Sequence, residues 1–194
     1  MRLQQYINES EMSIEEINTL IHKKCKPYLK LIKGEYPLYR GMDTGYSLKG
    51  IKDVRTDRHS KGMSTNNFNI LNSWLKKNGH AERSKSVIST SDKNFADYHG
   101  TVHYIFPMGK FKYTYIEAKD LNIDYPNTGW DVDVIGYFEM GIDNEVKDYF
   151  HTDKGFKIAY KNKYEIWFES KQYIYADTFY DWDISKEVLV KNET

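Results

Sequence analysis

The sequence predicts an α+β domain in which helices come first and strands later. Residues 13–32 carry apolar side chains at helical spacing, whereas after Thr101 aromatic and β-branched residues recur at every second position in short runs. Aromatic residues make up 15% of the 194 residues, which favours strands with half-buried faces. We expect a single domain over residues 1–194, with a helical segment over residues 1–34.

The N-terminal segment contains a capping box from Ser13 to Glu16, which is a common helix start. The apolar positions that follow it at helical spacing are Ile14, Ile17, Leu20, Ile21, Leu29 and Ile32. Pro27 is expected to kink or split this helix, and Gly34 is expected to end it.

The next segment is expected to hold a short strand, a loop and a second helix. Residues 36–40 are predicted to form a strand that leads into Gly41. The polar residues 43–64 are predicted to form a long loop. Ser64 or Thr65 is expected to cap the helix that follows.

A brief strand at residues 87–90 is expected to precede a short helix, which Ser91 or Asp92 caps and which runs through Tyr98. Residues 130–140 are expected to be helical. The remaining strand candidates are residues 101–106, 111–116, 164–168, 173–176 and 188–190.

Composition excludes several classes of protein. The net charge is zero, although the first hundred residues carry 17 Lys and Arg against 11 Asp and Glu, so bulk charge does not drive nucleic-acid binding. Cys25 is the single cysteine, which excludes an internal disulfide and a cysteine-based zinc site, and we expect it to be a packed thiol. No apolar run approaches the ~18 residues of a membrane span, and the N-terminus lacks a secretory core. We therefore expect a cytoplasmic protein without a membrane partner.

Motifs for several common activities are missing. The sequence contains no GxxxxGK[ST], GxGxxG, HExxH or GxSxG motif. His99 and His103 lie four residues apart, but Gly100 and the β-branched residues after it argue against a helix that would bring the two rings together. We therefore expect no metal site.

Three separated segments carry candidate catalytic residues. They are Leu38-Tyr39-Arg40-Gly41, Ser89-Thr90-Ser91 and Tyr164-Glu165-Ile166-Trp167-Phe168. Taken singly, they are explained by a surface ion pair, a helix cap and a solvated glutamate. In this order and spacing they resemble the ADP-ribosyltransferase family of the arginine–serine–glutamate type. The residues 95–107 between them are similar to the helix and strand that follow the serine segment in that family.

The resemblance implies a split β-sandwich of two mainly antiparallel sheets. It also implies mono-ADP-ribosyl transfer from NAD to a protein or nucleic acid, with release of nicotinamide and without a metal. Members of the family include bacterial toxins and phage-encoded enzymes that modify host molecules. The partners implied are therefore NAD and a macromolecular acceptor, and the sequence gives no indication of the oligomeric state.

The resemblance assigns roles residue by residue. Glu165 would stabilise the positive charge that develops on the ribose as the bond to nicotinamide breaks. Arg40 would bind the pyrophosphate through its planar fork, and Ser89 would orient the ribose and the glutamate. The other NAD-binding residues that it implies are Gly41, Thr90, Ser91 and Tyr98. Tyr98 would stack on the nicotinamide ring, with ordinary core packing as the alternative.

Lys163 departs from the family pattern, in which a Glu or Gln commonly lies two residues before the catalytic glutamate. The lysine weakens the case for an arginine acceptor and leaves a nucleic-acid acceptor open. The basic segment 153–163, with Phe156 and Tyr160, would be the loop that recognises the acceptor, or would be a solvated hairpin. Arg83 is a further candidate for a phosphate contact, with solvent-facing charge as the alternative.

Two other functions stay open. Glu169-Ser170-Lys171 matches the end of a PD-(D/E)xK nuclease motif, in which Asp148 or Asp153 would help to bind Mg²⁺. Alternatively, the chain is a catalytically inactive binding module that has kept the fold.

Overall fold

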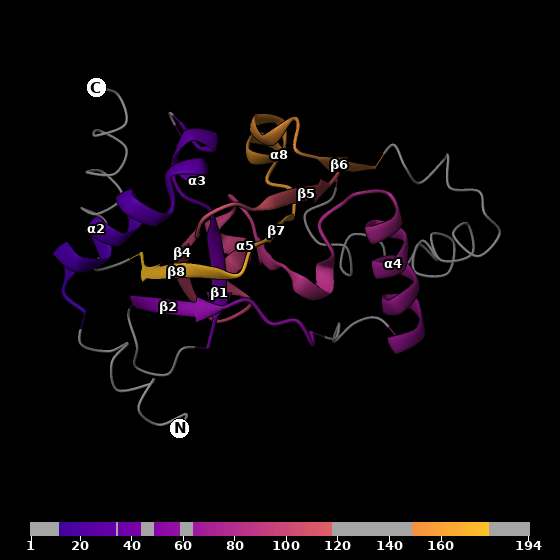
Figure 1. Cartoon of the computed structure of the whole chain (residues 1–194), viewed down its shortest axis with the longest axis horizontal. Helices are drawn as coiled ribbons and strands as arrows, with labels where there is room; N and C mark the ends of the chain where they lie inside the picture. The colour runs from indigo at the N-terminus through magenta and orange to yellow at the C-terminus, as the bar shows by residue number, and fades with distance from the viewer. Residues whose placement is uncertain (1–11, 34, 44–48, 59–63, 118–148, 179–194) are drawn as a thin grey trace. The chain divides into compact units, whose positions relative to one another are not determined.

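The computed structural model describes residues 12–33, 35–43, 49–58, 64–117 and 149–178. Within them the fold is α+β, with N-terminal helices and two four-stranded, mainly antiparallel sheets (Figure 1), so the predicted fold class is confirmed. The chain divides into two compact units that interleave in sequence. The first comprises Met1–Val54, Ser89–Phe111 and Ser170–Thr194, and the second comprises Arg55–Ile88 and Lys112–Glu169. The expectation of a single domain stays a prediction.

The first unit begins with helices α2 (Ile14–Lys24) and α3 (Lys26–Leu31). The predicted capping box is present, because the Ser13 hydroxyl accepts from the Glu16 N–H at 3.1 Å and the Glu16 carboxylate accepts from the Ser13 N–H at 2.7 Å. The helix divides at Cys25, and proline occupies the first turn of α3, where its missing N–H costs nothing. The split expected from Pro27 is therefore confirmed, and Gly34 lies outside the described residues.

The sheet of the first unit has the strand order β1-β4-β8-β2, and each neighbouring pair is antiparallel. Its strands are β1 (Tyr39–Met42), β2 (Lys49–Asp53), β4 (Thr101–Pro107) and β8 (Gln172–Asp177). The prediction for residues 36–40 was wrong in its limits, because the strand begins at Tyr39 and continues through Gly41. Residues 36–38 are not part of the strand, although the Leu38 carbonyl accepts from the Ile105 N–H of β4 at 3.0 Å.

The prediction that residues 43–64 form one loop was also wrong, because β2 lies within them. The strand is polar and contains Gly50, so its own residues give little strand signal. Its partner β8 supplies the missing stability, since Ile51 pairs with Ile174 and Gly50 pairs with Tyr175. A Cβ on Gly50 would lie 2.9 Å from the Tyr175 hydroxyl, so the absence of a side chain makes room for that ring.

A short helix, α5 (Lys93–Asp97), follows the serine segment. The Asp92 carboxylate caps it by accepting from the N–H groups of Asn94 and Phe95 at 3.1 and 3.3 Å. This confirms the expected helix, which ends at Tyr98.

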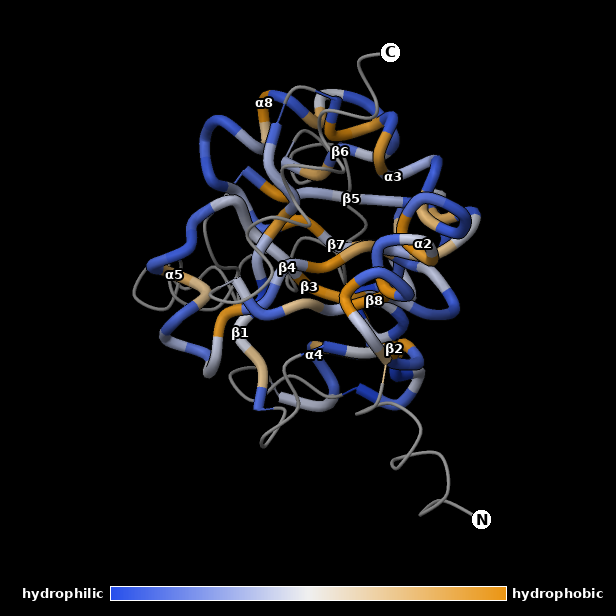
Figure 2. Tube along the Cα trace, turned by 90° about the vertical axis from the view of Figure 1, so that its left-hand side faces the viewer, coloured by the Kyte–Doolittle hydropathy of each residue, from blue (hydrophilic) through white to orange (hydrophobic). Residues whose placement is uncertain are grey.

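The second unit contains the other sheet, with the strand order β3-β7-β5-β6. Its strands are β3 (Val87–Ser89), whose last residue belongs to the first unit, β5 (Lys112–Ile116), β6 (Phe150–Thr152) and β7 (Ile166–Glu169). Helix α4 (Thr65–Lys77) has Ser64 as its N-cap, as predicted, and η1 (Arg83–Lys85) is a single 3₁₀ turn. Hydrophobic residues concentrate on strands such as β3 and β7 (Figure 2), and Ile166, Trp167 and Phe168 are fully buried.

The segment before Glu165 is a helix, α8 (Phe156–Asn162), so both the loop and the hairpin expected for residues 153–163 were wrong. Gly155 adopts φ of +71° at the start of α8, a conformation that glycine tolerates. Phe156 anchors the helix, because its buried ring packs edge-on to Tyr113 with the ring centroids 5.8 Å apart. Strand β7 begins at Ile166 instead of Tyr164. The elements predicted at residues 130–140 and 188–190 lie outside the described residues.

Candidate functional site

The first unit brings the arginine and serine segments together. Tyr39 and Thr90 form an antiparallel bridge, in which the Tyr39 N–H donates to the Thr90 carbonyl at 2.7 Å and the Thr90 N–H donates to the Tyr39 carbonyl at 3.0 Å. Arg40 follows Tyr39 on β1, and Ser89 precedes Thr90. Two segments that lie about fifty residues apart in the sequence therefore run side by side.

The serine segment is well packed. Ser89 and Thr90 are 3% and 5% exposed, and the Thr90 hydroxyl accepts from the Asp92 N–H at 3.1 Å. Asp92 in turn caps α5. Thr90 therefore joins β1 to the turn that begins the helix.

Gly41 lies where β1 packs closely against α5, and Tyr98 lies at the end of that helix. A Cβ on Gly41 would overlap the Ala96 carbonyl oxygen and would lie 2.8 Å from the main-chain carbon of His99. Only glycine fits at this position. Tyr98, which ends α5, is 86% exposed. Core packing of Tyr98 is therefore wrong, and its ring is open to solvent.

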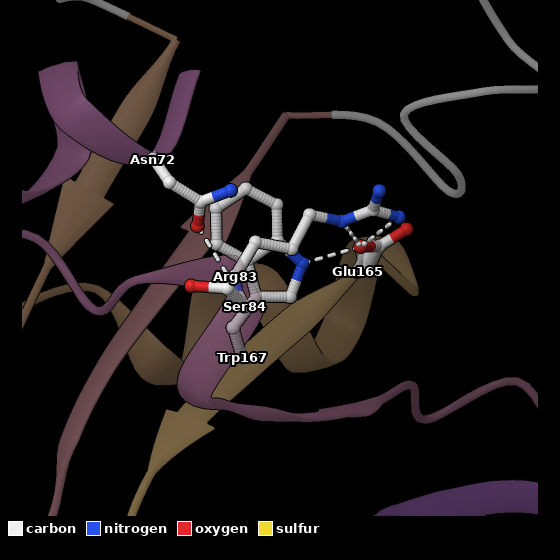
Figure 3. Close-up of polar contacts among 5 residues, drawn as sticks. All are labelled: Asn72, Arg83, Ser84, Glu165 and Trp167. Atoms are coloured by element: carbon white, nitrogen blue, oxygen red, sulfur yellow. Dashed lines mark hydrogen bonds and ion pairs between the residues drawn. The ribbon is translucent and has the colours of Figure 1, made fainter. Parts of the chain in front are cut away.

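The second unit holds Glu165, directly before β7 and only 3% exposed. Figure 3 shows its carboxylate facing Arg83 from η1 and Trp167 from β7. Arg83 Nε and Nη2 donate to Oε1 of Glu165 at 3.2 and 3.1 Å, and Trp167 Nε1 donates to the same oxygen. The side chains of the ion pair are 6% and 4% exposed, so the charges are shielded from water and interact strongly.

Contacts with α4 fix the turn that carries Arg83. The Ser84 N–H donates to Asn72 Oδ1 at 2.8 Å, and Asn72 Nδ2 donates to the Phe68 carbonyl at 2.6 Å (Figure 3). The Arg83 guanidinium also lies 5.7 Å from the centre of the Trp167 ring, a cation–π distance. The solvent-facing alternative for Arg83 is therefore wrong. Sequence reasoning missed the partnership, because 82 residues separate Arg83 from Glu165.

The residues expected to recognise the acceptor differ in exposure. Phe156 is buried, Tyr160 is half-buried, and Lys163 is exposed with φ of +60° where α8 ends. Lys154, Lys157 and Lys161 are also exposed along this helix and the residues before it. The result is a basic surface formed by the four lysines, which ends two residues before Glu165.

Two acidic residues of the nuclease alternative accept hydrogen bonds from main-chain N–H groups. Glu169 accepts from the Glu82 N–H at 3.1 Å, and Asp153 accepts from the Tyr113 N–H at 3.2 Å. Across the described ranges, no group of three or more His, Cys, Asp or Glu residues is arranged to hold a metal ion. Asp148 lies outside those ranges.

The candidate residues thus fall into two sets. The first unit contains Arg40, Gly41, Ser89, Thr90, Ser91 and Tyr98, and the second unit contains Glu165, Lys163, Tyr160 and Phe156. Among the described residues, no helix has the length and apolar character needed to cross a membrane. Comparisons with protein-family models, curated proteins and solved structures gave no match to this chain.

Proposed function

We propose that this protein is an NAD-dependent mono-ADP-ribosyltransferase that modifies a macromolecular acceptor and releases nicotinamide. The observation that carries the proposal is the bridge between Tyr39 and Thr90, which brings the candidate pyrophosphate-binding arginine beside the serine segment. A second observation supports it: Glu165, the candidate catalytic carboxylate, is held by directed hydrogen bonds. Both observations concern residues to which the resemblance assigns roles.

In the proposed reaction, the bond between C1′ of the ribose and the nicotinamide nitrogen breaks. Its electron pair stays with the nitrogen, so nicotinamide leaves as a neutral molecule and positive charge develops on the ribose. The Glu165 carboxylate stabilises that charge in the transition state. A lone pair of the acceptor then forms the new bond to C1′, and the acceptor's proton passes to solvent.

The other residues bind and orient NAD in this proposal. The guanidinium of Arg40 binds the pyrophosphate through two parallel hydrogen bonds, which a lysine does not offer. Ser89 orients the nicotinamide ribose, Gly41 presents main-chain groups to the carboxamide, and Tyr98 stacks on the nicotinamide ring. Thr90 and Ser91 support the end of the strand that carries Ser89 and the loop that follows it.

For acceptor recognition we propose the exposed surface of α8 and the residues beside it. Tyr160 and Lys163 contact the acceptor, and Phe156 holds the helix in place from within the core. The four lysines of this surface favour an anionic acceptor, either an acidic protein surface or the phosphates of a nucleic acid. Treatment of the labelled product with nuclease or protease distinguishes the two.

The test is release of nicotinamide from NAD by the full-length protein, with Glu165→Gln compared to Glu169→Gln. We expect Glu165→Gln to lower kcat by about 10²-fold or more, because it removes charge needed in the transition state. Glu169→Gln should stay within about threefold, since the amide oxygen still accepts the hydrogen bond from the Glu82 N–H. Circular dichroism establishes that both variants are folded. Full turnover by folded Glu165→Gln would overturn the proposed mechanism.

One observation favours a second candidate, an inactive module that binds NAD. Glu165 is buried against Arg83, which is also the arrangement of a purely structural ion pair. NAD binding without release of nicotinamide would support this candidate. Mg²⁺-dependent cleavage of nucleic acid that requires Lys171 would instead support the nuclease alternative.

A further inference from the structure

Three N–H donors converge on a single oxygen of Glu165. Two come from the Arg83 guanidinium, at 3.2 and 3.1 Å, and the third comes from the Trp167 indole. One donor leaves a carboxylate able to turn about its last side-chain bond, whereas three donors from two directions define its position. The buried setting adds to this restriction, because little water is available to compete for the oxygen.

The donors themselves are held. Trp167 is fully buried in β7, and its ring also faces the Arg83 guanidinium. Arg83 lies on the η1 turn, which the Asn72 side chain ties to α4 through the Ser84 N–H. The η1 turn, helix α4 and strand β7 therefore all help to fix the position of the carboxylate, which does not depend on the rotamer of Glu165 alone (Figure 3).

We propose that Arg83 is a positioning residue for Glu165, with Trp167 as its partner in that role. The catalytic consequence rests on the proposed function: a carboxylate that is fixed before the reaction stabilises charge on the ribose without first reorienting. A shift of about 1 Å in such a group can cost on the order of 10²-fold in rate. The role requires a guanidinium, because a lysine ammonium lacks the planar fork that places Nε and Nη2 on the same oxygen.

The test that is independent of activity is hydrogen exchange at the tryptophan indoles, followed by NMR on the full-length protein. The sequence has four tryptophans, and the Trp167→Phe and Trp74→Phe variants assign the two relevant resonances. In Arg83→Lys we expect the Trp167 indole N–H to exchange about tenfold faster or more, because its acceptor is no longer fixed. The Trp74 indole, in the same unit, should change by less than about twofold.

Trp74 and Lys85 provide the controls. A merely structural role for Arg83 would accelerate exchange at Trp74 and Trp167 together, and that result would overturn the proposal. Unchanged exchange at Trp167 would also overturn it. Lys85→Met removes another cation from the same turn, one that pairs with Glu82 at 2.9 Å, and it should leave Trp167 exchange as in the wild type. If Arg83→Lys fails to fold, Arg83→Met is measured in its place, with the same expectation.

Nicotinamide release then separates this proposal from the proposed function. We expect Arg83→Lys to lower kcat by about 10²-fold, with KM for NAD changed by less than about threefold. If Arg83→Lys accelerates exchange at Trp167 but not at Trp74, and the wild-type protein does not cleave NAD, the positioning role is kept and the proposed function is rejected. Glu165-dependent cleavage with unchanged Trp167 exchange would keep the function and reject the positioning role.

Discussion

His80 lies in the second unit with 7% of its surface exposed, and its ring stacks on Trp74 at 5.3 Å between centroids. Burial lowers the pKa of His80 to about 4, and the charges of Lys112 and His151 act in the same direction, against that of Asp153. In the described part of the chain its Nδ1 atom makes no hydrogen bond. His80 is therefore a neutral ring that packs as an aromatic side chain near pH 7.

This burial predicts a loss of stability in mild acid. Between about pH 6.5 and pH 4 the unfolded chain protonates His80 whereas the folded protein does not, so the free energy of unfolding falls as the pH falls. The full effect is at most about 3 kcal/mol. Urea denaturation at pH 7 and pH 4.5 measures it.

The His80→Phe variant keeps the stacking on Trp74 and removes the titration, so its stability should fall less between the two pH values. His99→Gln, which replaces an exposed histidine, should fall as much as the wild type. If His80→Phe and the wild type lose the same stability between pH 7 and pH 4.5, the loss does not come from His80.

The surroundings of a side chain could be predicted where neighbouring residues determine them, and could not where the partner lies far away in the sequence. Cys25 was expected to be a packed thiol from its place in the first helix pattern, and it is fully buried. Glu165 was found through a resemblance, but its partners Arg83 and Trp167 were not. Trp167 is only two residues away, yet its indole was interpreted as part of an apolar strand. The guanidinium comes from 82 residues earlier, and no local pattern records such a pairing.

At the scale of elements, the contact between β1 and α5 depends on Gly41. We expect Gly41→Ala to lower the free energy of unfolding by about 1–3 kcal/mol, because its methyl group would overlap the Ala96 carbonyl and crowd His99. Thermal denaturation of the purified variant measures the loss. The same crowding would displace the main chain beside Arg40.

Gly109→Ala is the matched control for this variant. Gly109 has φ of +70° and open space around the position of a Cβ, so alanine there costs only backbone strain, about 1 kcal/mol. A Gly41→Ala protein that is as stable as the wild type would mean that β1 and α5 separate without cost. That outcome would contradict the close packing.

Elements with local signals were predicted well, and elements stabilised by distant partners were not. The capping box of α2, Ser64 before α4 and Asp92 before α5 are encoded within four residues of each helix start. Strand β2 is polar and is a strand because β8 pairs with it. Helix α8 is short and rich in lysine, and it is held by Phe156 against a ring from β5. Neither partner could be identified from the segment's own residues.

At the scale of the whole chain, the two units are joined at four points, after Val54, Ile88, Phe111 and Glu169. Two of these connections, after Glu169 and after Ile88, are short and lie beside strands. Strand β7 ends at Glu169 and β8 begins at Gln172, while β3 ends at Ser89 and the next residue forms the bridge to Tyr39. Each unit is thus built from segments that continue along the chain into the other unit, which favours unfolding as one cooperative transition.

Two probes, one in each unit, test this expectation in a urea titration. Cys25 reports the first unit: burial raises its pKa to about 12, so it should react with a thiol reagent at pH 8 only as the unit opens. The Trp167 indole resonance reports the second unit. We expect equal midpoints for the two signals, because the chain passes between the two units at four points. Labelling of Cys25 at urea concentrations where the Trp167 resonance is still intact would show instead that the first unit opens independently, despite the four connections.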